Sequence, residues 1–257
     1  MNTDLQKASL GKRFSAWLFD VILLATVAVL FGFILSSILN YDSYYDSLDQ
    51  AYTKYETQYG IDFEITQDAY LAMDEEQQTA YRQAYDKAYE ALIADEATMH
   101  TYSMVVNLAM LIASIGILLG YLVMEFLVPL WFKNGQTLGK KIFGIGVMRT
   151  DSIRLTTVQL FIRTVLGKYA VGTMIPVYVI ILLFLGTVGI VGIALVMGLM
   201  IAQVICLFAG GEGRTIHDRL AGTVAVDLAS QRIFRDSQEL IDYTEKVHAE
   251  QAKHQDY

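Results

Sequence analysis

The chain has 257 residues, of which 54% are hydrophobic, and its mean hydropathy is +0.39. A soluble protein of this length is rarely so apolar, so the composition indicates an integral membrane protein. The single cysteine excludes a disulfide framework and a Cys-x-x-Cys metal site within one chain, and the net charge of −8 is spread unevenly.

The first apolar run, residues 15–39, predicts a membrane-spanning helix. Residues 16–39 would extend about 36 Å as a helix, and the apolar core of a bilayer is ~30 Å thick. The run is too long for a cleavable signal peptide, so we expect it to stay in the membrane. Arg13 precedes it and Asp20 lies inside it, seven residues later, on nearly the same helix face. An ionised carboxylate is costly there, so Asp20 should face the helix bundle and meet a cation or a hydrogen-bond donor.

Residues 40–101 form an acidic segment with three basic side chains against fourteen acidic ones. Tyrosines recur in it at three- and four-residue steps, which predicts a helical hairpin that is zipped together by tyrosines and extends the first two membrane helices beyond the membrane. We expect Gly60 to end its first helix, residues 61–67 to form an extended connector and Asp74 to cap the second helix. Packing between the helices is the simpler interpretation of the tyrosines, and the alternative is a surface for an envelope partner, a sugar or a cation.

The second span is predicted over residues 102–132. Glu125 lies four residues before Pro129, which frees the backbone carbonyl of Glu125 from its usual hydrogen bond. Another segment or an ion should satisfy this carbonyl, so Glu125 is a second candidate for a polar site inside the membrane. Gly116 and Gly120 form a Gly-x-x-x-Gly pair that favours close helix contact.

The loop 133–169 carries predicted structure of its own. Residues 145–156 indicate two short strands around a turn, and residues 221–227 are β-prone and able to add a strand. An amphipathic helix begins at Thr156 and is expected to lie in the inner membrane interface before the next span. The glycines and lysines that follow residue 133 lack the spacing of a phosphate-binding loop, so no nucleotide binding is predicted.

Residues 170–209 are too long for one crossing and about right for two. Glycines near the middle permit a tight turn, so we predict spans over 170–187 and 189–209. The alternative is one span plus a re-entrant segment. A ladder of small residues marks a helix-contact face on the last span, within one chain or between two: Ala194, Gly198 and Ala202.

Lysine and arginine orient the predicted loops. The N-terminal segment 1–14 has three, loop 133–169 has seven and residues 210–257 have six. Because such residues favour the cytoplasmic side, both termini should face the cytoplasm and 40–101 the outside. Four spans give that parity and three do not. The prediction is an all-α multi-pass protein of the cytoplasmic membrane, with a small cytoplasmic β-hairpin, an Arg/Asp loop and strand at 210–228 and a polar tail at 229–257.

Three motifs in this order resemble the RDD family of prokaryotic membrane proteins. The first, Arg-x-x-Ala-x-x-x-Asp, reads here Arg13, Ala16 and Asp20. The second, Gly-x-Thr-x-Gly-Lys, reads Gly135, Thr137, Gly139 and Lys140. The third, Asp-x-x-Ala-Gly-Thr, reads Asp218, Ala221, Gly222 and Thr223. The likeness covers about 11–39 and 104–228, without the acidic segment or the tail, and it implies a transport role, with cation/proton antiport proposed for some members.

Two functional hypotheses follow. In the first, the chain transports a small ion or solute through a polar site formed by Arg13, Asp20, Glu125 and Asp218, and because four helices are few for a transport path, a homodimer is favoured. In the second, that cluster is a structural ion pair and the protein is a membrane-anchored interaction module whose hairpin binds an envelope partner. No serine nucleophile, His-Glu-x-x-His or histidine-cluster motif is present, so we expect no enzyme, cofactor, metal or nucleic-acid partner.

Overall fold

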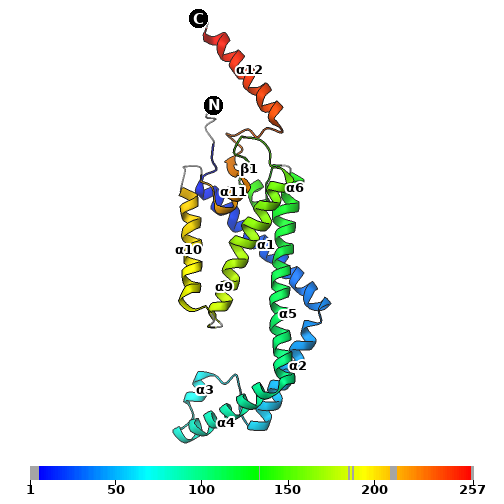
Figure 1. Ribbon diagram of the computed structural model, residues 1–257, viewed down its shortest axis with the longest axis vertical. Coiled ribbons are helices and arrows are strands. Elements are labelled where there is room, and N and C mark those ends of the chain that lie inside the picture. Colours follow the sequence, from blue (N-terminus) through cyan, green and yellow to red (C-terminus); the bar gives the residue numbers. More distant parts are fainter. Residues whose placement is uncertain (1–5, 133, 185, 187, 209–212, 256–257) are drawn as a thin grey trace. The chain divides into compact units, whose positions relative to one another are not determined.

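The computed structural model describes residues 6–132, 134–184, 186, 188–208 and 213–255. In chain order its helices and strands are α1 (Leu10–Ile38), α2 (Tyr41–Tyr59), α3 (Gln67–Leu71), α4 (Glu75–Ala94), α5 (Glu96–Tyr121), η1 (Leu122–Leu127), α6 (Val128–Phe132), α7 (Leu138–Ile142), β1 (Ile145–Arg149), α8 (Thr157–Phe161), η2 (Ile162–Met174), α9 (Ile175–Phe184), α10 (Gly189–Phe208), α11 (Ile216–Ala221), β2 (Thr223–Asp227) and α12 (Ser237–Gln255) (Figure 1). The elements η1 and η2 are wound as π-helices.

Four helical segments are long and apolar enough to cross a membrane: Leu10–Ile38, Glu96–Phe132, Thr157–Phe184 and Gly189–Phe208. They expose large apolar side chains, as lipid contact requires, with Phe184 at 88% and Trp131 at 80% exposure. The predicted helical membrane fold with four spans is therefore confirmed. The predicted span ends at 187 and 209, and residues 1–5 of the N-terminal segment, lie outside the described residues.

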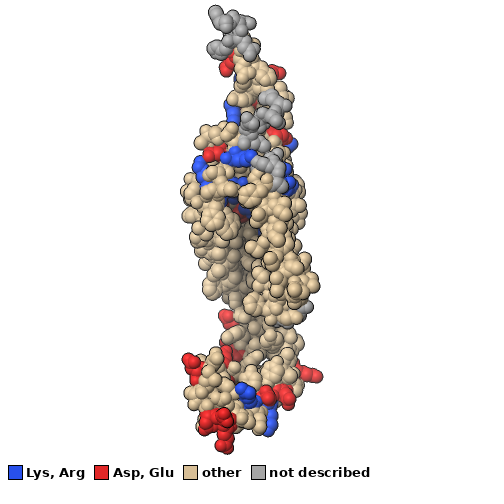
Figure 2. All heavy atoms as spheres, turned by 90° about the vertical axis from the view of Figure 1, so that its left-hand side faces the viewer, with Lys and Arg blue, Asp and Glu red and all other residues tan. Residues whose placement is uncertain are grey.

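The chain divides into two compact units, Met1–Phe31 with Ile117–Tyr257 and Gly32–Gly116. In the first unit, α9 and α10 pack side by side as two separate helices, as predicted for residues 170–209 (Figure 1). Lys and Arg of this unit gather around the end that carries the sheet, whereas Asp and Glu predominate on the visible face of the second unit (Figure 2).

The second unit contains the predicted helical hairpin, in which α2 packs against α4. As predicted, Gly60 ends α2 in a left-handed conformation with φ of 65°, and Asp74 caps α4 by accepting a hydrogen bond from the backbone N–H of Gln77 at 2.8 Å. The expected mutual packing of tyrosines differs in one respect. Phe63, from the connector, lies between Tyr52 and Tyr85 with ring centroids 5.5 and 5.4 Å away.

Two expectations for this hairpin are corrected. The connector is not extended throughout, because residues 63–64 form a turn in which the Ile65 N–H donates to the Asp62 carbonyl at 3.3 Å, and the short helix α3 begins at Gln67. The hairpin helices are also not continuations of the first two spans. Asn40 takes a left-handed conformation, φ 52°, between α1 and α2, and Asp95 is extended between α4 and α5. Asparagine adopts that conformation more readily than most residues, which permits the break.

The first unit contains a two-stranded antiparallel sheet, in which β1 pairs with β2 from Ile145 opposite Asp227 to Arg149 opposite Thr223. The predicted strand after the turn does not form. Only three residues separate the turn at Ser152 from the helix cap at Thr156, and two of them, Ile153 and Arg154, make isolated bridges instead. The β-prone segment 221–227 supplies the partner strand.

The core of this unit lies between the sheet and the start of α1. Ala8, Ala16, Ile145 and Ala225 form one buried cluster. Residues before α1 extend the sheet, since the Ala8 N–H donates to the Ala225 carbonyl at 3.4 Å and Lys7 bridges Val226. The sheet therefore holds the N-terminal end of α1 in place.

The expected interfacial helix after Thr156 is not separate from the third span. One continuous helix runs from Thr157 to Phe184 through α8, η2 and α9. Thr156, where the helix was expected to begin, is its N-cap and forms a capping box with Gln159. The polar side chains that favoured an interfacial position, Arg163 and Lys168, find charged partners inside the fold, so the helix has no reason to turn at the membrane surface.

The small residues behave differently from one another. A Cβ at Gly120 would lie 3.2 Å from the Ala28 Cβ and 3.3 Å from the Leu24 carbonyl, so α5 and α1 approach closely there. On α10, no described atom lies within 4 Å of a Cβ placed at Gly198, and Ala194 is exposed. That ladder makes no such contact within the described part of the chain.

Candidate functional site

Asp20 on α1 is 5% exposed and is bound by the segment that begins α7. Thr137 Oγ1 donates a hydrogen bond to Asp20 Oδ2 at 2.5 Å, and the Gly139 N–H donates to Oδ1 at 2.8 Å. Lys140 Nζ lies 3.5 Å from Oδ2. The prediction that this carboxylate would face inward and meet a cation or donors describes its surroundings correctly.

Gly139 permits this arrangement because any larger residue would collide with α1. A Cβ there would lie 2.3 Å from the Ala16 carbonyl oxygen and 2.9 Å from Asp20 Oδ1. Ala16 itself is 1% exposed. The Arg-x-x-Ala-x-x-x-Asp and Gly-x-Thr-x-Gly-Lys motifs are therefore two sides of one contact. The glycine of the second motif sits on the alanine of the first, and its threonine binds the aspartate.

Glu125 extends the cluster through two lysines. Glu125 lies on η1 and is 8% exposed as a residue. Lys168 Nζ lies 2.5 Å from its Oε2. Lys140 Nζ lies 3.9 Å from the same oxygen, between Glu125 and Asp20. We call Asp20, Thr137, Lys140, Glu125 and Lys168 the Asp20 network. Its two carboxylates and two ammonium groups have a formal net charge of zero.

The backbone carbonyl of Glu125 is satisfied by another segment, as the proline in the sequence predicts. Thr164 Oγ1 on η2 donates to this oxygen at 2.9 Å. Thr164 is 1% exposed. The irregular winding near Pro129 therefore joins the second and third candidate spans by a hydrogen bond.

Asp218 forms a separate cluster on the sheet side. It is 0% exposed and accepts hydrogen bonds from Arg163 Nη1, from the Thr215 backbone N–H at 3.1 Å and from Thr215 Oγ1 at 2.7 Å. Arg163 Nη1 also donates to Thr223 Oγ1 at 2.7 Å, and Arg13 Nη2 lies 3.6 Å from Asp218 Oδ2. We call these five residues the Asp218 cluster.

Two ionisable groups of α11 are strongly perturbed. Burial would raise the pKa of Asp218, but Arg163 and the hydrogen bonds from Thr215 outweigh it and hold the pKa far below its usual range. Burial lowers the pKa of His217 well below its usual value, although Asp218 acts in the opposite sense. His217 is therefore neutral at pH 7, and its Nε2 lies 2.9 Å from Thr215 Oγ1.

The structure separates the four residues that were expected to share one polar site. Arg13 pairs with Asp218 and donates to the Gly213 carbonyl, whereas Asp20 pairs with Lys140. Two helical turns carry Asp20 about 10 Å along the axis from Arg13, so each meets a different segment of the chain. The remaining motif residues belong to the surrounding backbone and core. Gly135 has a left-handed conformation with φ 61°, Gly222 ends α11 with φ 65°, and Ala221 is buried.

Sequence reasoning missed Arg163 and Lys168 as site residues, because it placed them on the polar face of an interfacial amphipathic helix. Their partners come from other elements, Asp218 from α11 and Glu125 from η1. The π-helical winding of η2, with hydrogen bonds between residues five apart, was not predicted either. No local pattern in the sequence points to these long-range pairs.

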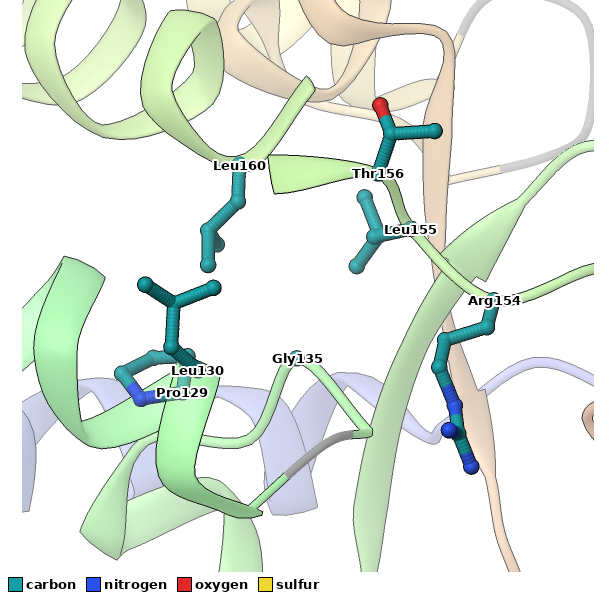
Figure 3. Close-up of a pocket in the computed structure, with 7 residues that line it drawn as sticks. All are labelled: Pro129, Leu130, Gly135, Arg154, Leu155, Thr156 and Leu160. Atoms are coloured by element: carbon teal, nitrogen blue, oxygen red, sulfur yellow. The ribbon is translucent and has the colours of Figure 1, made fainter. Parts of the chain in front are cut away.

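Neither cluster resembles a metal centre, and neither lines the pocket found beside them in the first unit. Among the residues described by the structure, no group of three or more His, Cys, Asp or Glu side chains is placed to hold a metal ion. A pocket of about 150 Å³ lies beside the Gly135 turn, where the Arg154 side chain points away from its apolar interior (Figure 3). Its lining residues are Pro129, Leu130, Gly135, Arg154, Leu155, Thr156 and Leu160, and it contains no member of the Asp20 network or the Asp218 cluster.

Comparison with known families identifies this arrangement. The model of the RDD family matches residues 7–222, a range that encloses the whole Asp20 network, Asp218 with its arginines, and also the acidic segment that the motifs alone left outside the likeness. Comparison with curated proteins and with solved structures finds no match. The family match covers most of the chain, and the chain belongs to the RDD family.

Proposed function

We propose that this RDD-family membrane protein transports a small ion or solute through the Asp20 network, with cation/proton exchange as the candidate reaction. The supporting observation is that the network buries two carboxylates and two ammonium groups and joins three candidate spans. Ionisable side chains are expensive inside a membrane and typically mark ion pathways or proton relays.

The neutrality of the network suits an exchange of like charges. If Lys168 releases its proton, Glu125 loses its closest counter-charge, and a monovalent cation taking that place restores a net charge of zero. One proton leaves and one cation enters. The cation would find oxygen atoms at Glu125, Asp20 and Thr137, which are the ligands that hard cations prefer. Protonated Lys168 and a cation would thus compete for one carboxylate, that of Glu125.

The proposal includes an orientation and an assembly. The protein would lie in the cytoplasmic membrane with both termini in the cytoplasm. The excess of Lys and Arg outside residues 40–101 supports this orientation. Because four spans are few for a transport path, a homodimer is included. The exposed small residues Ala194 and Gly198 on α10 support it as a helix-contact face. The proposal assigns the chain no catalytic activity, cofactor or nucleic-acid partner.

Proton flux in proteoliposomes tests the transport proposal. Purified protein is reconstituted with a pH-sensitive dye inside, and gradients of Na⁺, K⁺ or Li⁺ are imposed. We expect Asp20→Asn and Glu125→Gln to abolish cation-dependent flux, while Glu245→Gln, at an exposed site on α12, leaves it unchanged. Size-exclusion chromatography and circular dichroism check that the variants fold. Normal flux in a folded Asp20→Asn protein would overturn the proposal.

A non-transporting, membrane-anchored interaction protein is the second candidate. It is favoured by the tight pairing of both buried aspartates, since Asp20 and Asp218 are 5% and 0% exposed and accept several hydrogen bonds each. In this case both clusters are structural and the hairpin binds an envelope partner. Deleting residues 42–99 should remove a protein from cross-linked pull-downs. An unchanged set of captured proteins would count against this candidate.

A further inference from the structure

The second unit contains a pocket of about 180 Å³ lined by three tyrosines. Tyr52 comes from α2, Tyr89 from α4 and Tyr102 from α5. Aliphatic side chains, among them Leu48 and Leu92, complete the lining. A cavity of roughly 150 Å³ admits a molecule of the size of benzene, so this pocket has room for a small organic ligand.

The rings of the pocket are held in place by neighbours. Tyr52 meets Phe63 edge to face at 5.5 Å, and Tyr89 stacks on Tyr85 at 6.4 Å with an interplanar angle of 9°. Burial and the neighbouring phenols raise the pKa of Tyr52, so its ring stays neutral. The aromatic surface is therefore preorganised before any ligand arrives.

These tyrosines differ from the ones that serve the fold. Tyr55 donates a hydrogen bond to Asp95 Oδ2 at 3.0 Å, and Tyr81 donates to the Asp62 carbonyl. Within the described part of the chain, the hydroxyls of the three pocket tyrosines make no hydrogen bond, and Tyr89 and Tyr102 are 49% and 41% exposed. Packing of the hairpin alone does not require three such rings to converge on an open space.

The electrostatic environment of the pocket is negative. Residues 40–101 have a net charge of −11, from three basic and fourteen acidic side chains. Asp95 is held beside the pocket wall, because Thr98, which lines the pocket, donates to it through its hydroxyl at 3.0 Å. Hydrogen bonds from Thr98 and Tyr55 lower the pKa of Asp95, so this carboxylate remains ionised near neutral pH.

We propose that this pocket binds a small soluble organic cation bearing a methylated ammonium group, of the choline class. Tyrosine faces attract cations, and methyl groups around the charge suit the aliphatic lining. A bare metal ion fits less well, since the described residues contain no cluster of three or more His, Cys, Asp or Glu side chains. A neutral sugar would gain nothing from the negative charge. The inference is independent of transport through Asp20 and would stand if that proposal failed.

Calorimetric titration of the full chain tests the inference. The protein is placed in nanodiscs of phosphatidylethanolamine and phosphatidylglycerol, which carry no methylated ammonium group. We expect saturable binding of choline and tetramethylammonium, and binding at least about tenfold weaker for 3,3-dimethyl-1-butanol, the neutral isostere of choline. Equal binding of the alcohol, no saturable binding of choline, or binding of maltose in its place would each overturn the proposal.

Variants locate the site. Replacing Tyr89 with leucine should weaken choline binding about three- to thirtyfold, because one aromatic face is lost, whereas Tyr89→Phe should bind about as well as the parent. Asp95→Asn should also weaken it. Tyr45→Leu is the matched control, because Tyr45 lies on α2, stacks on Tyr41 and does not line the pocket. Circular dichroism verifies helix content. If Tyr45→Leu weakens binding as much as Tyr89→Leu, the loss is not specific to the pocket and the pocket assignment is wrong.

Discussion

Replacing Gly139 with alanine tests whether the close contact of α7 with α1 holds the Asp20 network together. The added Cβ would lie 2.3 Å from the Ala16 carbonyl oxygen and 2.9 Å from Asp20 Oδ1. A backbone oxygen cannot rotate aside as a side chain can, so α7 must move away from α1. That movement stretches the hydrogen bonds that Asp20 accepts from Thr137 at 2.5 Å and from the Gly139 N–H at 2.8 Å.

The magnitude follows from two terms. Overpacking of a tight interior contact costs about 1–3 kcal/mol, and a hydrogen bond to a charged group contributes about 1.5–3 kcal/mol. Losing one such bond together with the packing therefore destabilises the protein by about 2.5–6 kcal/mol. At about 2–4 °C per kcal/mol for a chain of this size, the apparent melting temperature should fall by about 10 °C.

Circular dichroism in detergent measures this melting temperature. Gly11→Ala is the matched control, because no described atom lies within 4 Å of a Cβ placed at Gly11 on the same span. We expect the control to melt at the temperature of the parent or slightly above it, since alanine favours helix. If Gly139→Ala melts together with Gly11→Ala, the close approach of α7 to α1 does not stabilise the protein and the reasoning fails.

Three further predictions concern the charged groups. The folded pKa of His217 is lowered, so below pH ~6.5 the unfolded chain binds more protons than the folded protein. The melting temperature should therefore fall from pH ~7.5 to ~5.5, and this fall should be smaller in His217→Gln. Equal pH dependence of the melting temperature in both proteins would contradict this. The folded pKa of Asp218 is also lowered, so ionised Asp218 stabilises the folded protein at every pH above its unfolded pKa of about 4. Its contribution is therefore constant between pH ~5.5 and ~7.5. Asp218→Asn should cost about 3–5 kcal/mol by leaving buried arginines without a counter-charge, whereas Asp227→Asn, in an ion pair that is partly exposed, should cost under ~1 kcal/mol by the same melting assay. Glu125→Gln and Lys168→Gln should each destabilise strongly, and the double variant should lose less than the sum, because it leaves no buried charge unpaired. Additive losses would mean that the two side chains act separately.

The features predicted from the sequence are those that depend on local composition. Long apolar runs predict the four candidate spans, and the cost of an aspartate in lipid predicts that Asp20 meets donors and a cation. The proline rule predicts that another segment satisfies the Glu125 carbonyl, which Thr164 does. Cap residues at Gly60 and Asp74 follow from backbone conformation and hydrogen bonding. Each of these depends on residues close in sequence.

The features that were missed depend on long-range partners. Arg163 and Lys168 were missed because their carboxylate partners, Asp218 and Glu125, lie on other elements. The partner of β1 is β2 and not the segment after the turn, because the helix cap at Thr156 leaves too few residues for a second strand. Arg13 meets Asp218 instead of Asp20 because different later segments of the chain pack against the two positions on α1.

The distance along the chain between these partners has a consequence for biosynthesis. Asp20 binds Thr137, which is 117 residues later, and Arg13 binds Gly213, which is 200 residues later. Lys12 pairs with Asp227 at a separation of 215 residues. During synthesis the first span is therefore made with its arginine and aspartate unpaired, and they remain so until the ribosome has released the later segments that bind them. If the ribosome stalls before residue 137, the first span of the nascent chain still carries an unpaired aspartate. A nascent chain in that state would be recognisable to membrane proteases and insertases by this unpaired charge.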